Sequence, residues 1–166
     1  MKKVILIDDN YIVSEGIKIN IDWNVLNAEV SFITQNGRDA LEYARNEHID
    51  LIITDIEMPN IDGITLSREI LKINPYIKII LISAYDRFEY AIEAMHIKAF
   101  DYLLKPWKEE KLTGLITEAI SSIKEISFDD GKSENLQDSQ KSIIKKYIKE
   151  NYKRDISAGD VAGILG

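Results

Sequence analysis

Four short apolar runs, each ending in a polar or charged residue, constrain the fold of this chain more than any other feature. Each run has the length and the aliphatic content of a buried strand. The runs and their polar ends are Val4–Ile7 with Asp8 and Asp9, Leu51–Thr54 with Asp55, Ile79–Ile82 with Ser83, and Asp101–Leu104 with Lys105. If the runs are parallel strands, three carboxylates, one hydroxyl and one ammonium meet at one edge of one sheet.

Segments with helical spacing alternate with these runs. A further strand is expected within Ala28–Thr34, which gives five βα units. The expected helices are one containing Ile12 and Ile17, one entered through Asn36-Gly37, one after Asp62-Gly63 that ends at Asn74-Pro75, one opened by Asp86 and Glu89 in capping-box spacing, and one after Pro106 with Leu112, Leu115, Ile116, Ala119, Ile120 and Ile123 on one face. Such alternation predicts an α/β fold, a doubly wound five-stranded parallel sheet with helices on both faces.

Composition and charge divide the chain into parts. The apolar pattern of residues 1–126 is lost over residues 127–140, which are rich in Asp, Ser, Gly, Lys, Asn and Gln and predict a linker. Residues 141–166 carry a net charge of +3, whereas residues 1–140 carry −10. This last part has the pattern of a short all-α fragment, and its different charge suggests a different partner.

The chain has the composition of a soluble protein. It contains no cysteine, and no run approaches the roughly 20 apolar residues of a membrane span. The stretch from Met1 to Asp8 is too short and too soon acidic for a signal peptide. We therefore expect a cytoplasmic protein without a membrane partner.

The polar strand ends suggest phosphoryl chemistry. Three neighbouring carboxylates, Asp8, Asp9 and Asp55, would repel one another, so the site needs a cation or must hold protons. Oxygen ligands without cysteine favour Mg²⁺ or Mn²⁺, which also binds phosphate oxygens. Asp55 ends the more central strand and is the candidate nucleophile, whereas Lys105 and Ser83 can bind the phosphoryl oxygens.

These residues, with Thr54 to Gly63, Ser83-Ala84-Tyr85 and Asp101 to Pro106, closely resemble the receiver domain of two-component response regulators. The resemblance covers about residues 2–125 and implies a flavodoxin-like fold. It implies that Asp55 accepts a phosphoryl group from a sensor histidine kinase, and that Mg²⁺ is held by Asp8, Asp9, Asp55 and the backbone carbonyl of Glu57. It also implies a cis peptide between Lys105 and Pro106, and a switch in which Tyr102 turns inward when Ser83 moves to the phosphoryl group.

Two positions depart from the commonest receiver pattern. Glu57 stands where many members carry a neutral or basic residue, and Tyr85 is large for its place. In the family both positions border the path of the hydrolytic water. They therefore bear on the lifetime of the phosphoryl group.

A second resemblance concerns the end of the chain. Residues 143–166 resemble the opening of an AraC-type DNA-binding domain, and the helix that would enter the major groove would begin after Gly166. The resemblance implies transcriptional output through promoter DNA for the full-length protein, but no DNA binding by this truncated chain. A homodimer formed upon phosphorylation is a further expectation from the receiver family.

Two other functions compete with a phosphorylation switch. A Mg²⁺-dependent phosphohydrolase with an aspartyl-phosphate intermediate is one, although such enzymes place their two acidic residues two positions apart, whereas Asp8 and Asp9 are adjacent. A degenerate receiver that signals only through protein contacts is the other. The intact acceptor, acidic pair and lysine favour a switch that is not a turnover enzyme and whose only chemistry is the phosphorylation and dephosphorylation of Asp55.

Overall fold

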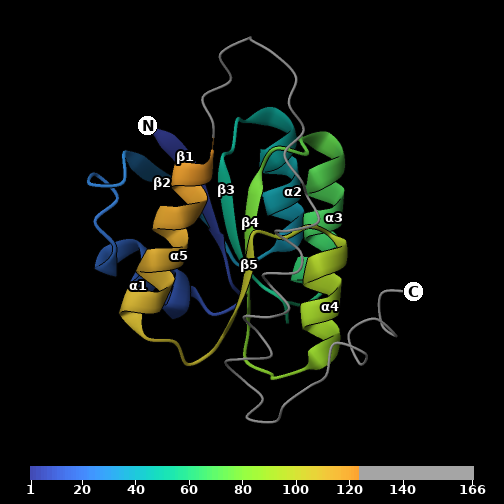
Figure 1. Ribbon diagram of the computed structural model, residues 1–166. Coiled ribbons are helices and arrows are strands. Elements are labelled where there is room, and N and C mark those ends of the chain that lie inside the picture. The colour runs from blue at the N-terminus through green and yellow to red at the C-terminus, as the bar shows by residue number, and fades with distance from the viewer. Residues whose placement is uncertain (124–166) are drawn as a thin grey trace.

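The computed structural model describes residues 1–123, which form a five-stranded sheet between two layers of helices (Figure 1). The strands are β1 (Lys2–Ile7), β2 (Ala28–Thr34), β3 (Leu51–Asp55), β4 (Lys78–Ser83) and β5 (Asp101–Leu104). The helices are α1 (Tyr11–Asn20), α2 (Gly37–Asn46), α3 (Gly63–Ile73), α4 (Phe88–His96) and α5 (Glu109–Ser122). The expected order of five βα units is confirmed. The expected linker and the basic C-terminal part lie outside the described residues.

The sheet is wholly parallel, with the strand order β2-β1-β3-β4-β5. This is the flavodoxin-like doubly wound order, in which the chain winds outward in both directions from the centre. The order reverses at β1 and β3, so loops that follow these two strands diverge and leave space at the carboxyl edge. Asp8 follows β1 and Asp55 ends β3, which places both at the reversal point.

Side chains alternate between the two faces of the sheet, as strands require. One apolar layer packs the sheet against α2, α3 and α4, and the other packs it against α1 and α5. In Figure 1 these helix groups lie on opposite sides of the strands. Tyr102 belongs to the first layer, and its neighbour Leu103 belongs to the second. This two-residue period decides which polar side chains meet at the carboxyl edge.

Two helices that the sequence places at Asn36-Gly37 and after Asp62-Gly63 begin at side-chain caps. The side chain of Asn36 accepts a hydrogen bond from Arg38 N at the start of α2. Asp62 Oδ1 accepts hydrogen bonds from Ile64 N at 3.0 Å and Thr65 N at 2.8 Å at the start of α3. These bonds satisfy amide groups that have no partner within a helix, so both helices begin at a defined residue.

Gly63 lets α3 begin directly against the end of β3. A Cβ atom at this position would lie 2.1 Å from the carbonyl oxygen of Asp55, which is backbone and cannot move aside cheaply. The glycine therefore fixes how closely the α3 layer approaches the strand that carries Asp55.

The expected capping box of α4 is wrong. The helix begins at Phe88, so its N-cap is Arg87, which makes no side-chain capping hydrogen bond. Asp86 lies one residue too early to serve as that cap. The Arg87 guanidinium instead lies over the rings of Tyr85 and Tyr90, with 5.2 and 5.5 Å to the ring centroids. Such contacts contribute about 0.5–1 kcal/mol each at exposed sites.

None of the helices within residues 1–123 combines the length and the apolar character that a membrane crossing requires.

Candidate functional site

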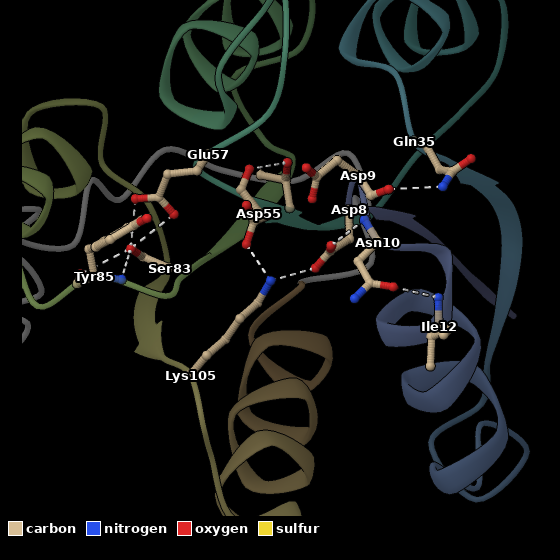
Figure 2. Close-up of polar contacts among 11 residues, drawn as sticks. Asp8, Asp9, Asn10, Ile12, Gln35, Asp55, Glu57, Ser83, Tyr85 and Lys105 are labelled. Carbon is tan, nitrogen blue, oxygen red and sulfur yellow. Dashed lines mark hydrogen bonds and ion pairs between the residues drawn. The ribbon is translucent and has the colours of Figure 1, made fainter.

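The polar strand ends divide into two groups at the carboxyl edge, and alternation along the strands explains the division. Asp8, Asp55 and Lys105 continue the series of residues that face α1 and α5. Ser83 and Tyr102 belong to the series that faces α2, α3 and α4. We name the first group the ion-pair half of the site and the second, together with Glu57 and Tyr85, the hydroxyl half. Figure 2 shows the ion-pair half and, of the hydroxyl half, Ser83, Glu57 and Tyr85.

Lys105 is the centre of the ion-pair half. Its Nζ lies 2.8 Å from Oδ2 of Asp8 and 2.5 Å from Oδ1 of Asp55 (Figure 2). Both carboxylate side chains are only 4% exposed, whereas the lysine side chain is 22% exposed. One ammonium therefore compensates two buried negative charges. The sequence predicts such a cation where these strand ends meet.

Burial controls the protonation of Asp55. Desolvation raises its pKa from 3.8 to about 6, and the hydrogen bond and charge of Lys105 oppose that rise. For Lys105, burial lowers the pKa, but hydrogen bonds with Asp55 and Asp8 outweigh burial and leave the pKa raised. Near neutral pH the lysine is charged and Asp55 is mostly ionised, which is the form needed for a nucleophile.

Ser83 is the centre of the hydroxyl half and is fully buried. Its Oγ lies 3.1 and 3.2 Å from the two carboxylate oxygens of Glu57 and 3.0 Å from the carbonyl oxygen of Tyr85. The Oγ also accepts a hydrogen bond from Tyr85 N at 2.9 Å. A hydroxyl has one proton to donate, so Glu57 and the Tyr85 carbonyl share or compete for it.

The carbonyl of Tyr85 joins Tyr102 to the same network. The Tyr102 hydroxyl donates to this oxygen at 3.0 Å, and Arg87 N donates to it at the same distance. The Tyr102 side chain is turned inward and buried. Burial, opposed by a hydrogen bond with Ser83, raises the pKa of Tyr102 to about 12, so the hydroxyl remains a donor at physiological pH.

Of the metal ligands implied by the resemblance, the carboxylates of Asp8 and Asp55 are brought together at the Lys105 ammonium. Within residues 1–123, no three acidic side chains converge into a ready-made metal site. Asp9 is exposed, and its backbone carbonyl accepts a hydrogen bond from Gln35 Nε2 at 2.9 Å. The donor chemistry nevertheless suits Mg²⁺: the Asp8 and Asp55 carboxylates offer oxygens alone, and Oδ1 of Asp55 is buried against the Lys105 ammonium. A cation is the partner that this oxygen requires, and Lys105 supplies that charge here.

The peptide bond between Lys105 and Pro106 is cis, as the resemblance implies.

The contact between the Glu57 carboxylate and Ser83 is the feature of the site that sequence reasoning missed. The resemblance to receivers singles out Glu57 for its backbone carbonyl and for its bearing on the lifetime of the phosphoryl group, but its carboxylate also reaches Ser83, 26 positions further along the chain. An acidic residue two positions after the candidate acceptor was the available signal. Nothing in the sequence indicates toward which strand such a side chain turns.

Comparison with known proteins identifies the family of this chain. The family model for the response regulator receiver domain matches residues 4–117. The chain is 31% identical to the transcriptional regulatory protein YesN of Bacillus subtilis over 96% of this chain and 43% of that protein. It is 27% identical to the transcriptional regulatory protein HptR of Staphylococcus aureus over 97% of this chain and 68% of that protein. The chain thus spans less than half of one relative and about two thirds of the other.

A solved structure shows the same fold at higher identity. The receiver domain of AraT, a response regulator from Geobacillus stearothermophilus, is 38% identical and superposes with a TM-score of 0.68 over 72% of this chain and 93% of that domain. The matched family model covers all four polar strand ends described above. The chain belongs to the response regulator receiver domain family, and its relatives are transcriptional regulators.

Proposed function

We propose that this chain is a phosphorylation-dependent switch in which Asp55 accepts a phosphoryl group from a sensor histidine kinase. The observation that carries the proposal is the position of Lys105, whose ammonium lies 2.5 Å from one Asp55 oxygen and 2.8 Å from Asp8. An ammonium held at a buried, mostly ionised carboxylate is ready to neutralise phosphoryl oxygens that arrive there.

The transfer balances with the groups present. An Asp55 carboxylate oxygen attacks phosphorus, the bond between phosphorus and the donor imidazole nitrogen breaks, and that nitrogen keeps the electron pair. The Lys105 ammonium then shifts its contact from the carboxylate to the phosphoryl oxygens and neutralises part of their charge. The Ser83 hydroxyl donates a hydrogen bond to another of these oxygens. Tyr102, whose hydroxyl shares the Tyr85 carbonyl oxygen with Ser83, then transmits the movement of Ser83 to the α4 side of the sheet.

Mg²⁺ is the proposed cofactor. Asp8, Asp9, Asp55 and the backbone carbonyl of Glu57 would hold it, and the ion would supply positive charge to the phosphoryl oxygens. When the ion binds, Lys105 would lose part of its contact with the carboxylates of Asp8 and Asp55. Because Lys105 has a raised pKa and remains charged, it stays available to the phosphoryl group when the ion shares the carboxylates.

Control of transcription is the proposed output of the full-length protein. YesN and HptR, to which the chain is similar, are transcriptional regulatory proteins. The AraC-type resemblance of residues 143–166 and the net charge of +3 over residues 141–166 support DNA as the partner of the longer protein. We further propose that phosphorylation favours a homodimer, that the boundaries 1–126, 127–140 and 141–166 separate the parts, and that the protein acts in the cytoplasm.

Incubation with Mg²⁺ and acetyl phosphate tests the proposal. Mass spectrometry should show one phosphoryl adduct on the chain, absent from Asp55→Asn and retained in the control Asp39→Asn, which changes an exposed acid of α2. An adduct that survives Asp55→Asn unchanged contradicts the proposed acceptor. Steady turnover of a phosphate ester would favour the phosphohydrolase instead, and absence of Mg²⁺ binding would favour the degenerate receiver.

A further inference from the structure

We infer that the Glu57 side chain is a latch that holds Ser83 away from Asp55 and must be displaced before Ser83 can bind a phosphoryl group. The inference rests on the proposed phosphorylation of Asp55. It assigns to Glu57 a positioning role through Ser83, separate from the backbone carbonyl proposed as a metal ligand.

Geometry is the first argument for the latch. Both carboxylate oxygens of Glu57 lie within 3.2 Å of Ser83 Oγ. Figure 2 shows the Ser83 side chain directed to Glu57 and Tyr85, while the Asp55 carboxylate is directed to Lys105. The hydroxyl group that should bind the phosphoryl group is therefore already occupied by a charged acceptor of its own.

Because Ser83 is buried, its hydrogen bond to Glu57 is costly to break. Ser83 is 0% exposed, so water cannot readily replace the partner that its hydroxyl would lose. A hydrogen bond to an ionised acceptor is also about twice as strong as one between neutral groups. Before Ser83 donates to a phosphoryl oxygen, it must leave both the Glu57 carboxylate and the carbonyl of Tyr85.

Charge gives the latch its release. A phosphoryl group on Asp55 carries about 1.5 to 2 negative charges where the ionised carboxylate carried one, so the negative charge near the Glu57 carboxylate increases. Repulsion therefore favours a Glu57 side chain turned away from the phosphoryl group, which frees Ser83 at the moment it is required. On another side the carboxylate lies beside Tyr90 of α4, where burial and then the charge of Glu57 raise the pKa of the tyrosine. The latch thus links Ser83 to the first turns of α4.

Beryllofluoride with Mg²⁺ is the probe, because it occupies an acceptor carboxylate as a phosphoryl group does and requires no kinase. Its apparent affinity is measured by NMR titration of the full 166-residue chain. Glu57→Gln keeps the shape and a neutral acceptor, and should bind the probe several-fold more tightly. Glu57→Ala removes the acceptor as well and should gain more, about tenfold, as expected for a lost hydrogen bond to a charged group.

Two further variants separate the latch from simple electrostatics. Ser83→Ala, combined with each Glu57 variant, completes a double-mutant cycle, and the gain should disappear when Ser83 is absent. Glu89→Gln removes an exposed charge from the first turn of α4 and should leave the affinity unchanged. Thermal unfolding followed by circular dichroism establishes that each variant is folded.

The outcomes are distinct. A gain in the Glu57 variants that requires Ser83 supports the latch. A gain that persists in the Ser83→Ala background, or no gain at all, overturns the latch while the proposed function stands. Failure of the unaltered chain to bind beryllofluoride contradicts the proposed function and the latch with it.

Discussion

Lys105 Nζ lies 2.5 Å from Oδ1 of Asp55, although the two residues end strands that are not adjacent in the sheet. The strand β4 separates them, and the lysine reaches past its end to the centre of the carboxyl edge. A long side chain from the edge strand β5 can do this because Lys105 stands one residue beyond that strand. The ion pair therefore connects the edge of the sheet to its centre.

Replacing Lys105 by methionine should cost about 1–3 kcal/mol of unfolding free energy. Loss of one partner leaves buried charge uncompensated, and the cost stays below the roughly 3–5 kcal/mol of a fully buried pair because Lys105 is 22% exposed. The pKa of Asp55 should rise above 6, because Lys105 lowers that pKa in the unaltered chain. Urea unfolding and a carboxyl NMR titration measure both effects. Lys108→Met, at an exposed lysine before α5, should leave both unchanged.

Asp55→Asn should change stability in a pH-dependent manner. The folded-state pKa of about 6 exceeds the ordinary 3.8, so the folded chain holds this proton more tightly than the unfolded chain does. The stability that the proton confers is complete below pH 4 and is lost as pH rises through 6. Relative to Asp55→Asn, the unaltered chain should therefore lose on the order of 2 kcal/mol between pH 4 and 7.

Urea unfolding in EDTA at several pH values, with both proteins measured side by side, checks this difference. The subtraction removes the titration of carboxylates that the two proteins share. A difference that is constant from pH 4 to 7 would contradict the raised pKa of Asp55.

Gly63→Ala should destabilise the fold by about 1–3 kcal/mol, as overpacking typically does. The added Cβ would lie 2.1 Å from the Asp55 carbonyl oxygen, so α3 or the end of β3 must shift. Gly114→Ala is the matched control, because nothing lies within 4 Å of its added Cβ and it stands within α5. That change should stabilise the chain by about 0.4–1 kcal/mol. Thermal and urea unfolding of the two variants should move in opposite directions.

Tyr102→Phe should lower stability by about 0.5–1.5 kcal/mol, the net value of one hydrogen bond. The Tyr85 carbonyl keeps its bonds from Ser83 and Arg87 N, so the loop should loosen without unfolding. Hydrogen exchange at the Arg87 amide should accelerate accordingly. Tyr11→Phe, which removes an exposed hydroxyl bonded to Glu15, is the control and should change stability by less than about 0.5 kcal/mol. Equal exchange rates in the two variants would argue against a role for the Tyr102 hydroxyl in holding the loop.

Sequence reasoning predicted the sheet well because each buried strand is short, aliphatic and bounded by polar residues. The strand ends at Asp55 and Ser83 follow directly from that pattern. Helix α1 shows where periodicity alone is insufficient: Ile17 is buried, whereas Ile12 and Ile19 are 78% and 75% exposed. Apolar residues on a helix identify the helix, but the position of the sheet decides which of them are covered.

The errors at the site arise from contacts between distant segments. The capping-box expectation for Asp86 used local spacing, whereas α4 begins one residue later, beyond Arg87 and its two tyrosine rings. The bond from Ser83, at the end of β4, to Glu57, in the loop after β3, depends on the rotamers of both side chains, which spacing along the chain does not specify. Residues that share a strand edge could be predicted, but the direction of a flexible side chain at that edge could not.

Lys105 and Asp55 belong to one face of the sheet, and Ser83 and Tyr102 belong to the other. The site therefore depends on the exact number of residues in each strand. A substitution changes one side chain and leaves its neighbours where they are. A one-residue deletion within β4 would instead bring Ala84 to the place of Ser83 and turn each side chain between the deletion and the end of the strand to the opposite layer. Among related chains, the lengths of the strands that carry these site residues should therefore vary far less than the amino-acid types within those strands.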